Sequence, residues 1–370
     1  MKSKIQTYGV LSLAAVPGLG SHRLRNLLTY FSSPDAVMHA SPRELVRVAG
    51  IDRKLATVIA HHKGGAAFAD EQLALVEKVN GRIITFWDDE YPELLKKIYD
   101  PPVVLFIRGE VLQKDHYSIA IVGTRHPTEY GKIITERISK ELSGKGVTII
   151  SGLARGIDTI AHTAAIQAGG RTLSIIGSSI DQIYPAENAK LVEQIEAQRC
   201  GAILSEFFMG TKTDPGNFPR RNRIISGCSL GTLIVESDHD GGAMITGTTT
   251  LDQNRELFCI PGPITSKKSN GTNRLIKQGN AKLVQTIDDI IEELEIPLRP
   301  ILSPDTKKTV PLNLTVFEQK LFDLLSGTPI HIDEISQQSA FSPSDTLVTL
   351  LSLEFKSLVK QLPGKYFVKQ

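Results

Sequence analysis

Apolar residues follow three different patterns along the chain, and each pattern predicts a different kind of unit. Residues 1–75 carry them at helical spacing between glycine turns, residues 76–295 carry them in short unbroken runs, and residues 313–370 return to helical spacing before a final hairpin. Residues 296–312 hold four prolines among polar side chains, a composition typical of linkers. The sequence therefore predicts a helical domain, an α/β core, a linker and a small C-terminal domain with these boundaries.

Two similar units follow one another in the N-terminal segment. In the first, residues 17–20 form a predicted turn and Ser21 is the predicted cap of the next helix; in the second, residues 48–52 take the place of the turn. This repeat resembles the helix-hairpin-helix motif, in which the backbone N–H groups of the turn meet a DNA phosphate. The alternatives are a helical bundle whose glycines only form turns, or a surface for protein contact.

The middle segment predicts a sheet of mostly parallel strands. Several of its apolar runs are unbroken, as expected when helices cover both faces of a sheet, and helical stretches separate the runs. The predicted strands are residues 82–86, 103–107, 118–122, 147–150, 172–176, 202–204, 232–235 and 257–260. The fold class that follows is an extended Rossmann-like α/β core.

The last segment predicts three helices and a β-hairpin, which resembles a winged helix. Its third helix, predicted at residues 343–354, carries Asp345 and Glu354 but no Arg or Lys. A helix that enters a DNA groove needs basic side chains. Protein contact, or a role that has been lost, is therefore favoured over duplex binding.

Charge and cysteine content narrow the possible functions. The net charge is only +2, and residues 1–71 carry nine Lys and Arg against five Asp and Glu. A near-neutral core can hold an anion only through local geometry. The cysteines Cys200, Cys228 and Cys259 have no metal or disulfide spacing and predict buried thiols of a cytoplasmic protein. No membrane-spanning run and no signal peptide is predicted, so no membrane contact is expected.

The predicted strand-to-helix loops are rich in small residues. Ligands of open parallel sheets bind at the carboxyl ends of the strands, where small residues let the backbone approach an anion. The residues concerned are Gly123, Thr124, Arg125, Ser151, Gly152, Ala154, Arg155, Gly156, Gly177, Ser178, Gly241 and Gly242. Several such loops on one edge favour an anionic ligand over a purely steric need for glycine.

The run from Asn217 to Gly227 carries three arginines behind an aromatic residue. Pro219 suits the first turn of a helix, so the arginines are expected to begin one. Arg220 and Arg223 share a helical face while Arg221 points elsewhere, which suggests one structural and two ligand-facing arginines. The alternative is an internal salt-bridge network with Glu206 and Glu236. Phe218 is expected either to stack on a base or to pack in the core, and Asn217 and Asn222 belong to the same run.

Several catalytic motifs are missing. The sequence has no Gly-x-x-x-x-Gly-Lys-Ser/Thr loop, no Gly-x-Gly-x-x-Gly after a strand, no His-Glu-x-x-His and no Gly-x-Ser-x-Gly. We therefore predict no catalytic residues, no metal and no cofactor. His162 follows the second glycine loop and is expected to be a packed polar residue.

These motifs together resemble the DprA/Smf family of DNA-processing proteins. The matching pieces are residues 121–125, 151–158, 184–188, 218–229 and 270–276. The resemblance implies a core that binds and protects incoming single-stranded DNA, forms a homodimer and loads the RecA recombinase during natural transformation. It departs from the usual family pattern at Thr124, where serine is common, at Ser179, where a second glycine is common, and at Ala186, where lysine is common.

The resemblance also implies particular contacts. It assigns DNA contacts to the glycine loops, to Arg125 and to the arginine run, together with Lys212. It assigns a dimer interface to Asn273, Leu275 and Ile276, although both apolar residues could instead pack against their own sheet.

Two other functions remain open. One is a nucleotide phosphoribohydrolase of the lysine-decarboxylase-like group, of whose loop Gly231, Thr232 and Glu236 survive. The other is an interaction scaffold without DNA binding.

Overall fold

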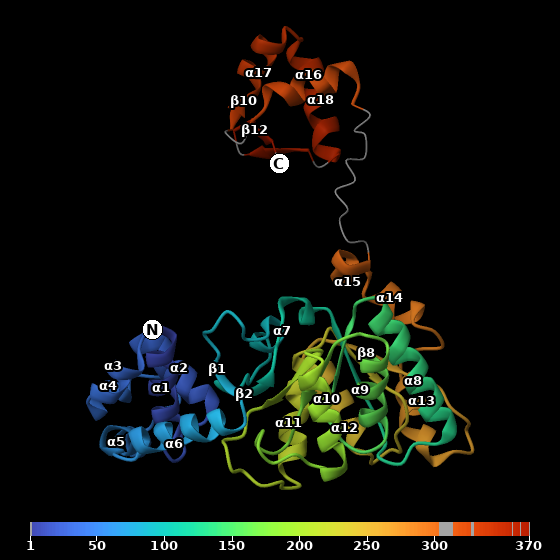
Figure 1. Cartoon of the computed structure of the whole chain (residues 1–370). Helices are drawn as coiled ribbons and strands as arrows, with labels where there is room; N and C mark the ends of the chain where they lie inside the picture. The colour runs from blue at the N-terminus through green and yellow to red at the C-terminus, as the bar shows by residue number, and fades with distance from the viewer. Residues whose placement is uncertain (1, 303–313, 327–328, 357, 363, 370) are drawn as a thin grey trace. The chain divides into compact units, whose positions relative to one another are not determined.

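The computed structural model describes residues 2–302, 314–326, 329–356, 358–362 and 364–369. It forms two compact units, Met1–Pro304 and Asp305–Gln370 (Figure 1). The first unit contains the N-terminal helices and a nine-stranded sheet, and the second contains a small helical domain with a three-stranded sheet. None of the described helices is long and apolar enough to cross a membrane.

The first unit begins with short helices joined by tight turns. They are α1 (Lys2–Ala14), α2 (Ser21–Phe31), α3 (Pro34–His39), α4 (Pro42–Leu45), α5 (Arg53–His61) and α6 (Gly65–Lys78). Gly18 and Gly50, at φ +80° and +86°, form the two repeated turns. Asp52 caps α5 by accepting a hydrogen bond from the Leu55 N–H. The predicted Ser21 cap is wrong: Gly20 is the N-cap of α2, and no side chain caps that end.

The sheet follows the strand order β1-β2-β6-β5-β4-β3-β7-β8-β9. The strands are β1 (Arg82–Thr85), β2 (Val104–Gly109), β3 (Ser118–Val122), β4 (Thr148–Ser151), β5 (Thr172–Ile175), β6 (Gly201–Ser205), β7 (Gly231–Ile234), β8 (Glu256–Cys259) and β9 (Lys282–Leu283). β2 pairs antiparallel with both β1 and β6, and the other pairs are parallel. The predicted α/β core is confirmed, with one added strand, β9, which is only two residues long and carries no apolar run.

Helices cover both faces of this sheet (Figure 1). The larger ones are α8 (Glu129–Gly144), α9 (Ile157–Gln167), α10 (Ala189–Ala197), α11 (Asn217–Gly227), α12 (Gly242–Asp252) and α13 (Asn270–Lys277). Shorter elements are α7 (Glu93–Lys96), α14 (Asp288–Glu293) and the 3₁₀ turns η1 (Gln113–His116), η2 (Ala186–Asn188) and η3 (Lys267–Ser269). α8 and α9 pack on one hydrophobic cluster, and α11 and α12 pack on another.

The N-terminal helices share a hydrophobic cluster with the sheet. Leu24 and Leu27 of α2 belong to the same buried cluster as Phe106 of β2 and Ile195 of α10. Leu105 and Ile107, which alternate with Phe106 along β2, belong to the cluster that packs beneath α11. Strand β2 therefore lies between two hydrophobic clusters: one face packs against the N-terminal helices and the other packs beneath α11.

The predicted linker begins with a helix instead. Residues Glu295–Leu302 form α15, and Leu298 is fully buried against the cluster that contains Ile290 and Leu294. Pro297 lies in the first turn, where its missing N–H has no helical partner to lose. Apolar packing has thus outweighed the proline content at this end, and the rest of the predicted linker, residues 303–312, lies outside the described residues.

The second unit has the predicted three helices and hairpin. They are α16 (Val316–Leu324), α17 (Ile332–Ser339), α18 (Pro343–Phe355), β11 (Val359–Leu362) and β12 (Tyr366–Lys369), with a short added strand β10 (Ile330–His331). Leu321, Ile335, Leu350 and Phe367 form its buried core. The winged-helix prediction is confirmed for this unit.

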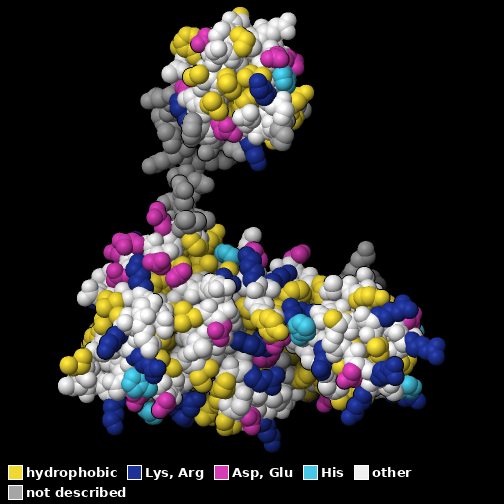
Figure 2. Space-filling view, turned by 180° about the vertical axis from the view of Figure 1, so that it is seen from behind, with side chains coloured by type: hydrophobic (Ala, Val, Ile, Leu, Met, Phe, Trp, Pro, Cys, Tyr) yellow, Lys and Arg dark blue, Asp and Glu magenta, His cyan; other side chains and the backbone are white. Residues whose placement is uncertain are grey.

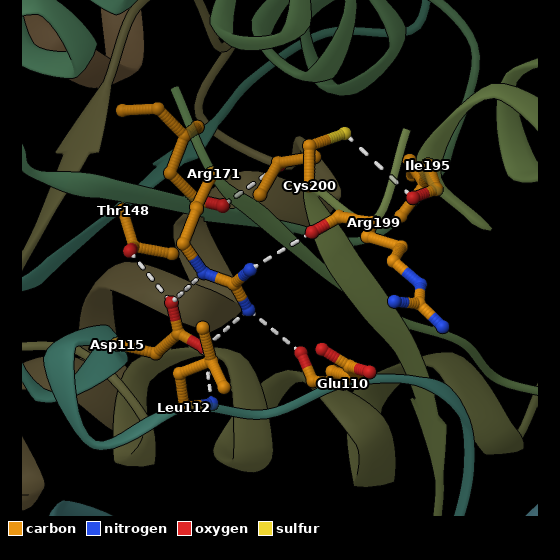
Figure 3. Close-up of polar contacts among 10 residues, drawn as sticks. Glu110, Leu112, Asp115, Thr148, Arg171, Ile195, Arg199 and Cys200 are labelled. Carbon is orange, nitrogen blue, oxygen red and sulfur yellow. Dashed lines mark hydrogen bonds and ion pairs between the residues drawn. The ribbon is translucent and has the colours of Figure 1, made fainter. Parts of the chain in front are cut away.

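A buried ion pair lies at the amino end of the parallel strands (Figure 3). The Arg171 guanidinium donates to both carboxylate oxygens of Asp115, at 2.7 and 2.8 Å, and to the backbone oxygens of Glu110 and Arg199. Asp115 also accepts from Thr148 Oγ1 at 2.9 Å and from the Leu112 N–H at 2.8 Å. The pair therefore links η1 to the starts of β4 and β5, and every carboxylate oxygen has a partner.

Removal of one member of this pair should strongly destabilise the protein. Arg171→Met leaves the Asp115 carboxylate buried without its counter-charge, and such losses cost about 3–5 kcal/mol of unfolding free energy. Urea unfolding of wild type and variant measures this difference. Lys140→Met is the control, because its exposed pair with Glu136 should contribute less than about 1 kcal/mol. Equal losses in the two variants would contradict the importance of the buried pair.

Candidate functional site

Four strand-to-helix loops meet at the carboxyl edge of the sheet. The loops follow β5, β4, β3 and β7, which are successive neighbours in the strand order. They surround three adjoining cavities, each lined by Arg125 and Phe218, of which the two larger have volumes of about 390 and 570 Å³. We call these cavities together the groove. It lies where ligands of open α/β sheets bind.

Most of the residues predicted from the sequence line the groove. They are Gly123, Thr124, Arg125, Gly152, Ala154, Arg155, Gly177, Ser178, Phe218, Arg221, Asn222, Gly241 and Gly242. The predicted residues that do not line it are Ser151, Gly156, Lys212, Asn217, Arg220 and Arg223. Ser151 is buried, with its hydroxyl donating to the Ile121 oxygen at 2.6 Å, whereas Lys212 is exposed.

The structure adds residues that sequence reasoning missed. Asp158, Tyr184, Ser237 and Asp238 line the groove, as does Lys268 from the 3₁₀ turn η3 before α13. Lys268 Nζ donates to the backbone oxygen of His126, which brings a lysine beside the first glycine loop although it lies far away in sequence. No local signal marks Lys268, because only the packing of two distant loops places it there. Asp158 and Tyr184, in contrast, belong to motifs already singled out.

Arg221 forms the floor of the groove. Its side chain is buried, and its Nη1 donates to the backbone oxygens of Gly152 and Ile175, at the ends of β4 and β5. Its guanidinium carbon also lies 5.9 Å from the centre of the Phe218 ring. Burial lowers the pKa of Arg221 to about 10, with Asp158 opposing the shift. Arg221 thus holds α11 against two strand ends.

The carboxylate of Asp158 forms hydrogen bonds with the backbone of its own glycine loop, residues 151–158. Its Oδ2 accepts from the N–H groups of Gly152 at 3.0 Å and Ala154 at 3.3 Å. Burial raises the pKa of Asp158 to about 6, although Arg221 and these hydrogen bonds favour the ionised form. The expected use of these two N–H groups for an external phosphate is therefore not what the structure shows, because a carboxylate of the protein already accepts both bonds.

Sterics account for several of the glycines. A Cβ on Gly156, at φ +78°, would lie 2.5 Å from the Thr124 oxygen, and one on Gly152 would lie 2.7 Å from the Arg221 guanidinium. Gly242 differs, because a Cβ there would meet no atom within 4 Å. The N–H groups of Gly242 and Ala243, at the start of α12, have no hydrogen-bond partner among the described residues. They are therefore the backbone donors that an anion in the groove can use.

Phe218 and Arg125 form the exposed part of the groove. The Arg125 guanidinium carbon lies 5.3 Å from the centre of the Phe218 ring. The centres of the Tyr184 and Phe218 rings lie 6.0 Å apart. Arg125 is exposed and has no acidic partner among the described residues. Gly177 allows this arrangement, because a Cβ there would lie 3.0 Å from the ring. A cation beside an aromatic face can hold a phosphate and a flat ring together.

The three arginines of α11 have three different environments. Arg221 is buried, whereas Arg223 pairs with Glu206 and donates to the Asp100 oxygen at 2.7 Å. Arg220 is exposed, with its guanidinium 5.3 Å from the centre of the Phe207 ring. The expectation of one structural and two ligand-facing arginines therefore needs correction, since two of the three bond within the protein. The helix also begins two residues before Pro219, at Asn217.

Only one of the two carboxylates expected to neutralise these arginines, Glu206 and Glu236, pairs with one of them. Glu206 does so, but Glu236 is buried elsewhere and accepts from the Thr128 N–H at 2.9 Å and from the Thr128 hydroxyl. Arg155, on the rim of the groove, pairs with Glu187 at 2.7 Å. The positive charge of the groove is therefore local: among the described residues, Arg125 and Lys268 line the groove without forming an ion pair.

His162 is fully buried behind the loops. Its Nδ1 bonds to the Thr172 hydroxyl, and burial lowers its pKa to about 3, so the ring is neutral. This environment fits the expected packed polar residue. No group of three or more His, Cys, Asp or Glu side chains that could hold a metal ion occurs within the described part of the chain.

The residues predicted for a dimer interface lie on α13. Leu275 is buried in the cluster beneath α11 and α12, and Ile276 packs partly against it. Asn273 exchanges two hydrogen bonds with the backbone of Gly262, at 2.9 and 3.1 Å. Leu275 thus packs against its own sheet, whereas Ile276 retains partial exposure, and the dimer interface stays a prediction.

The buried carboxyl of Asp158 predicts a pH-dependent stability. Its pKa is about 6 in the folded protein against an ordinary value of 3.8, so folding favours the neutral form. The stability from this group is complete below the unfolded pKa and is lost as the pH rises through 6. Relative to Asp158→Asn, the wild type should lose at most about 3 kcal/mol of unfolding free energy between about pH 4 and pH 7.

Urea unfolding of both proteins across this pH range measures the effect. Asp158→Asn removes the titrating group and also changes its hydrogen bonds, so only the pH dependence of the difference is diagnostic. A difference that stays constant with pH would show that Asp158 titrates alike in the folded and unfolded chains.

Comparisons with known proteins agree with one another. Residues 82–295 match the family model of DNA recombination-mediator protein A, residues 306–365 match the DprA winged helix domain, and residues 10–59 match a SAM-like helix-hairpin-helix tandem. Protein Smf of Synechocystis sp. is 31% identical over 396 residues, covering 97% of this chain and 98% of that protein. Protein Smf of Escherichia coli is 35% identical and covers 80% of both chains.

Solved structures give the same result. DNA processing protein A from Streptococcus pneumoniae aligns with a TM-score of 0.67 at 30% identity, covering 78% of this chain and 98% of that one. DNA processing protein A from Helicobacter pylori, whose structure was described for its single-stranded DNA binding mode, aligns with a TM-score of 0.52 at 30% identity, covering 58% and 95%. The chain therefore belongs to the DprA/Smf family of DNA recombination-mediator proteins.

Proposed function

We propose that the groove binds single-stranded DNA and that the protein acts as a recombination mediator in the cytoplasm. In this role it protects incoming single strands and loads the RecA recombinase onto them during natural transformation, and it catalyses no reaction itself. The observation that carries the proposal is the Arg125 guanidinium, which has no acidic partner in the described part of the chain, beside the half-buried ring of Phe218. The Helicobacter pylori relative, described for its single-stranded DNA binding mode, supports the choice of ligand.

The groove offers both kinds of contact that a single strand requires. Arg125, Lys268 and the free N–H groups at the start of α12 suit phosphate oxygens. Phe218 and Tyr184 offer ring faces on which unpaired bases can stack. None of these groups reads a base edge in a fixed pattern, so binding should depend little on sequence.

A homodimer and a RecA contact are part of the same proposal. Asn273 and Ile276 on α13 support the dimer because they keep some exposure, whereas Leu275 packs inward. The family resemblance supports RecA as the partner.

The phosphoribohydrolase alternative has little support in the geometry. Its required catalytic carboxylate corresponds to Glu236, which is 2% exposed, bonds to Thr128 and does not line the groove. Thr232 is also buried and bonds to the Thr250 hydroxyl at 2.8 Å.

This arrangement makes a specific prediction about activity. Incubation with nucleoside monophosphates should release no free base, because Glu236, the carboxylate that this reaction would require, is buried and does not line the groove. Chromatographic detection of the free base is the measurement. Release of base that Glu236→Gln abolishes would overturn the non-enzymatic proposal.

Substitutions in the groove should weaken DNA binding in two distinct ways. Arg125→Ala removes a phosphate contact, so the slope of log affinity against log salt should become shallower by about 0.7 for a single strand. Phe218→Leu removes a stacking face and should cost about 1–3 kcal/mol, with the salt slope unchanged. Fluorescence anisotropy with labelled oligothymidine at several salt concentrations measures both effects.

Lys140→Ala is the matched control, since it removes an exposed cation on α8 that pairs with Glu136 outside the groove. Binding by both groove variants at the affinity of this control would place the DNA contact elsewhere on the chain.

A further inference from the structure

We propose that a single strand leaving the groove crosses the first turns of α11 and continues over a second contact surface. This surface, which we call the hairpin surface, consists of Arg220, Tyr99, His22 and Arg23. It lies where α2 and α11 meet the loop between α7 and β2, within the first unit. The inference rests on the proposed function of the groove and assigns part of the bound strand to the N-terminal helices.

Tyr99 is the central feature of this surface. Its side chain is 88% exposed, far more than the rings of Tyr184 at 39% or Tyr130 at 41%. Its ring is nearly parallel to that of His22, with an interplanar angle of 22° and centroids 6.2 Å apart. Hydrophobic burial does not explain this ring position, because most of the ring faces solvent. A solvent-facing ring on a fixed backbone is instead suited to stack on an unpaired base.

The backbone that carries Tyr99 is held on both sides. Arg25 Nη2 donates to the Tyr99 oxygen at 3.2 Å, and Arg223 Nη1 donates to the Asp100 oxygen at 2.7 Å. The Arg25 guanidinium is itself 5.5 Å from the centre of the Phe86 ring. The ring is therefore preorganised, so a base that stacks on it does not have to order the loop.

Continuity with the groove follows from α11. Pro219 lines the groove, and the exposed Arg220 is its next residue. Arg220 and Arg223 share one helical face at a spacing of three residues, and Arg223 touches the backbone next to Tyr99. A strand that passes over Pro219 thus meets the exposed Arg220 cation, on the same helix whose Arg223 bonds to the backbone next to Tyr99.

The charge of the hairpin surface suits a polyanion. The exposed Arg23 donates to the Gly18 oxygen at 3.0 Å, and its side chain also lies beside Gly50, so it spans both repeated turns. Of the nearby acidic groups, Asp52 caps α5 and Glu206 pairs with Arg223. Asp100 is the third, and its buried Oδ1 has no hydrogen-bond partner among the described residues. Figure 2 shows that Lys and Arg predominate over Asp and Glu on one face of the N-terminal helices. The exposed Arg23 and Arg220 are the cations of the hairpin surface that attract phosphates.

A single strand fits these features better than a duplex. The bases of a duplex are already stacked on one another and present no free face to Tyr99, whereas a single strand presents both faces of each base. The surface therefore predicts a contact that only strands longer than the groove can make.

The test compares two lengths of labelled oligothymidine by fluorescence anisotropy. The short strand, of about 6 nucleotides, falls within the range of single-strand sites and fills the groove, and the long strand is about three times longer. Tyr99→Ala should bind the long strand about tenfold more weakly than wild type and the short strand equally well. Tyr99→Phe keeps the ring and should retain wild-type affinity for both. Arg23→Ala should make the salt slope shallower by about 0.7 for the long strand only.

Tyr30→Ala is the matched control, because Tyr30 is 54% exposed at the opposite end of α2. Equal binding of the long strand by wild type, Tyr99→Ala and Tyr30→Ala would overturn the hairpin surface while leaving the groove intact. Equal weakening on both lengths would also overturn it, because Tyr99 would then act within the groove. Failure of the wild type to bind either strand would instead refute the proposed function itself.

Discussion

The buried guanidinium of Arg221 is the constraint on which the groove depends. It joins the carboxyl ends of β4 and β5 to α11 through the backbone oxygens of Gly152 and Ile175. A buried cation without partners is strongly unfavourable, so its surroundings must supply acceptors and a counter-charge. Gly152 is required because a Cβ there would overlap the guanidinium, and Asp158 supplies the opposite charge. Phe218 lies beside the same cation, so its orientation follows from the same interaction.

The two ends of the parallel strands use buried arginines for different purposes. At the amino end, Arg171 and Asp115 pair with one another, and their remaining bonds go to the backbone of Glu110, Arg199 and Leu112 and to the Thr148 hydroxyl (Figure 3). At the carboxyl end, Arg221 uses its donors on strand ends, and Arg125 above it stays unpaired. The buried ion pair and the groove thus lie at opposite edges of one sheet. This polarity is general for open α/β sheets, in which the helix N-termini and loops gather at the carboxyl edge.

Sequence reasoning was accurate where a signal is local. Apolar runs, several of them unbroken, identified eight strands, because burial on both faces of a sheet favours a continuous apolar stretch. It failed where tertiary packing decides the outcome. The burial of Leu298 made α15 helical despite nearby prolines, and the two-residue strand β9 had no pattern to detect. Ser21 was mistaken for a cap because cap residues and first-turn residues have similar composition.

The candidate site shows the same division. The glycine loops and Phe218 were identified from motifs, and they do line one groove. The roles of the three arginines were only partly foreseeable: the salt-bridge alternative named Glu206, but helical spacing does not reveal that Glu206 pairs with Arg223 or that the Asp100 backbone lies beside it. Nor does spacing show that Asp158 occupies the N–H groups of its own loop. Whether a side chain contacts a ligand or bonds within the protein depends on its neighbours in the fold, which the residue type alone does not reveal.

The balance of charges in the groove bears on how it can hold a strand. Arg155 is paired with Glu187, Asp238 lines the groove, and Arg221 is enclosed, so few cations remain for phosphate. Counterion release by so few contacts gives only a modest affinity and a modest salt slope. In the proposed complex with single-stranded DNA, stacking on Phe218 and Tyr184 would therefore supply much of the binding free energy, since each stacked base contributes about 1–3 kcal/mol. A chain of net charge +2 can bind a polyanion on these terms, because ring faces replace a general positive field.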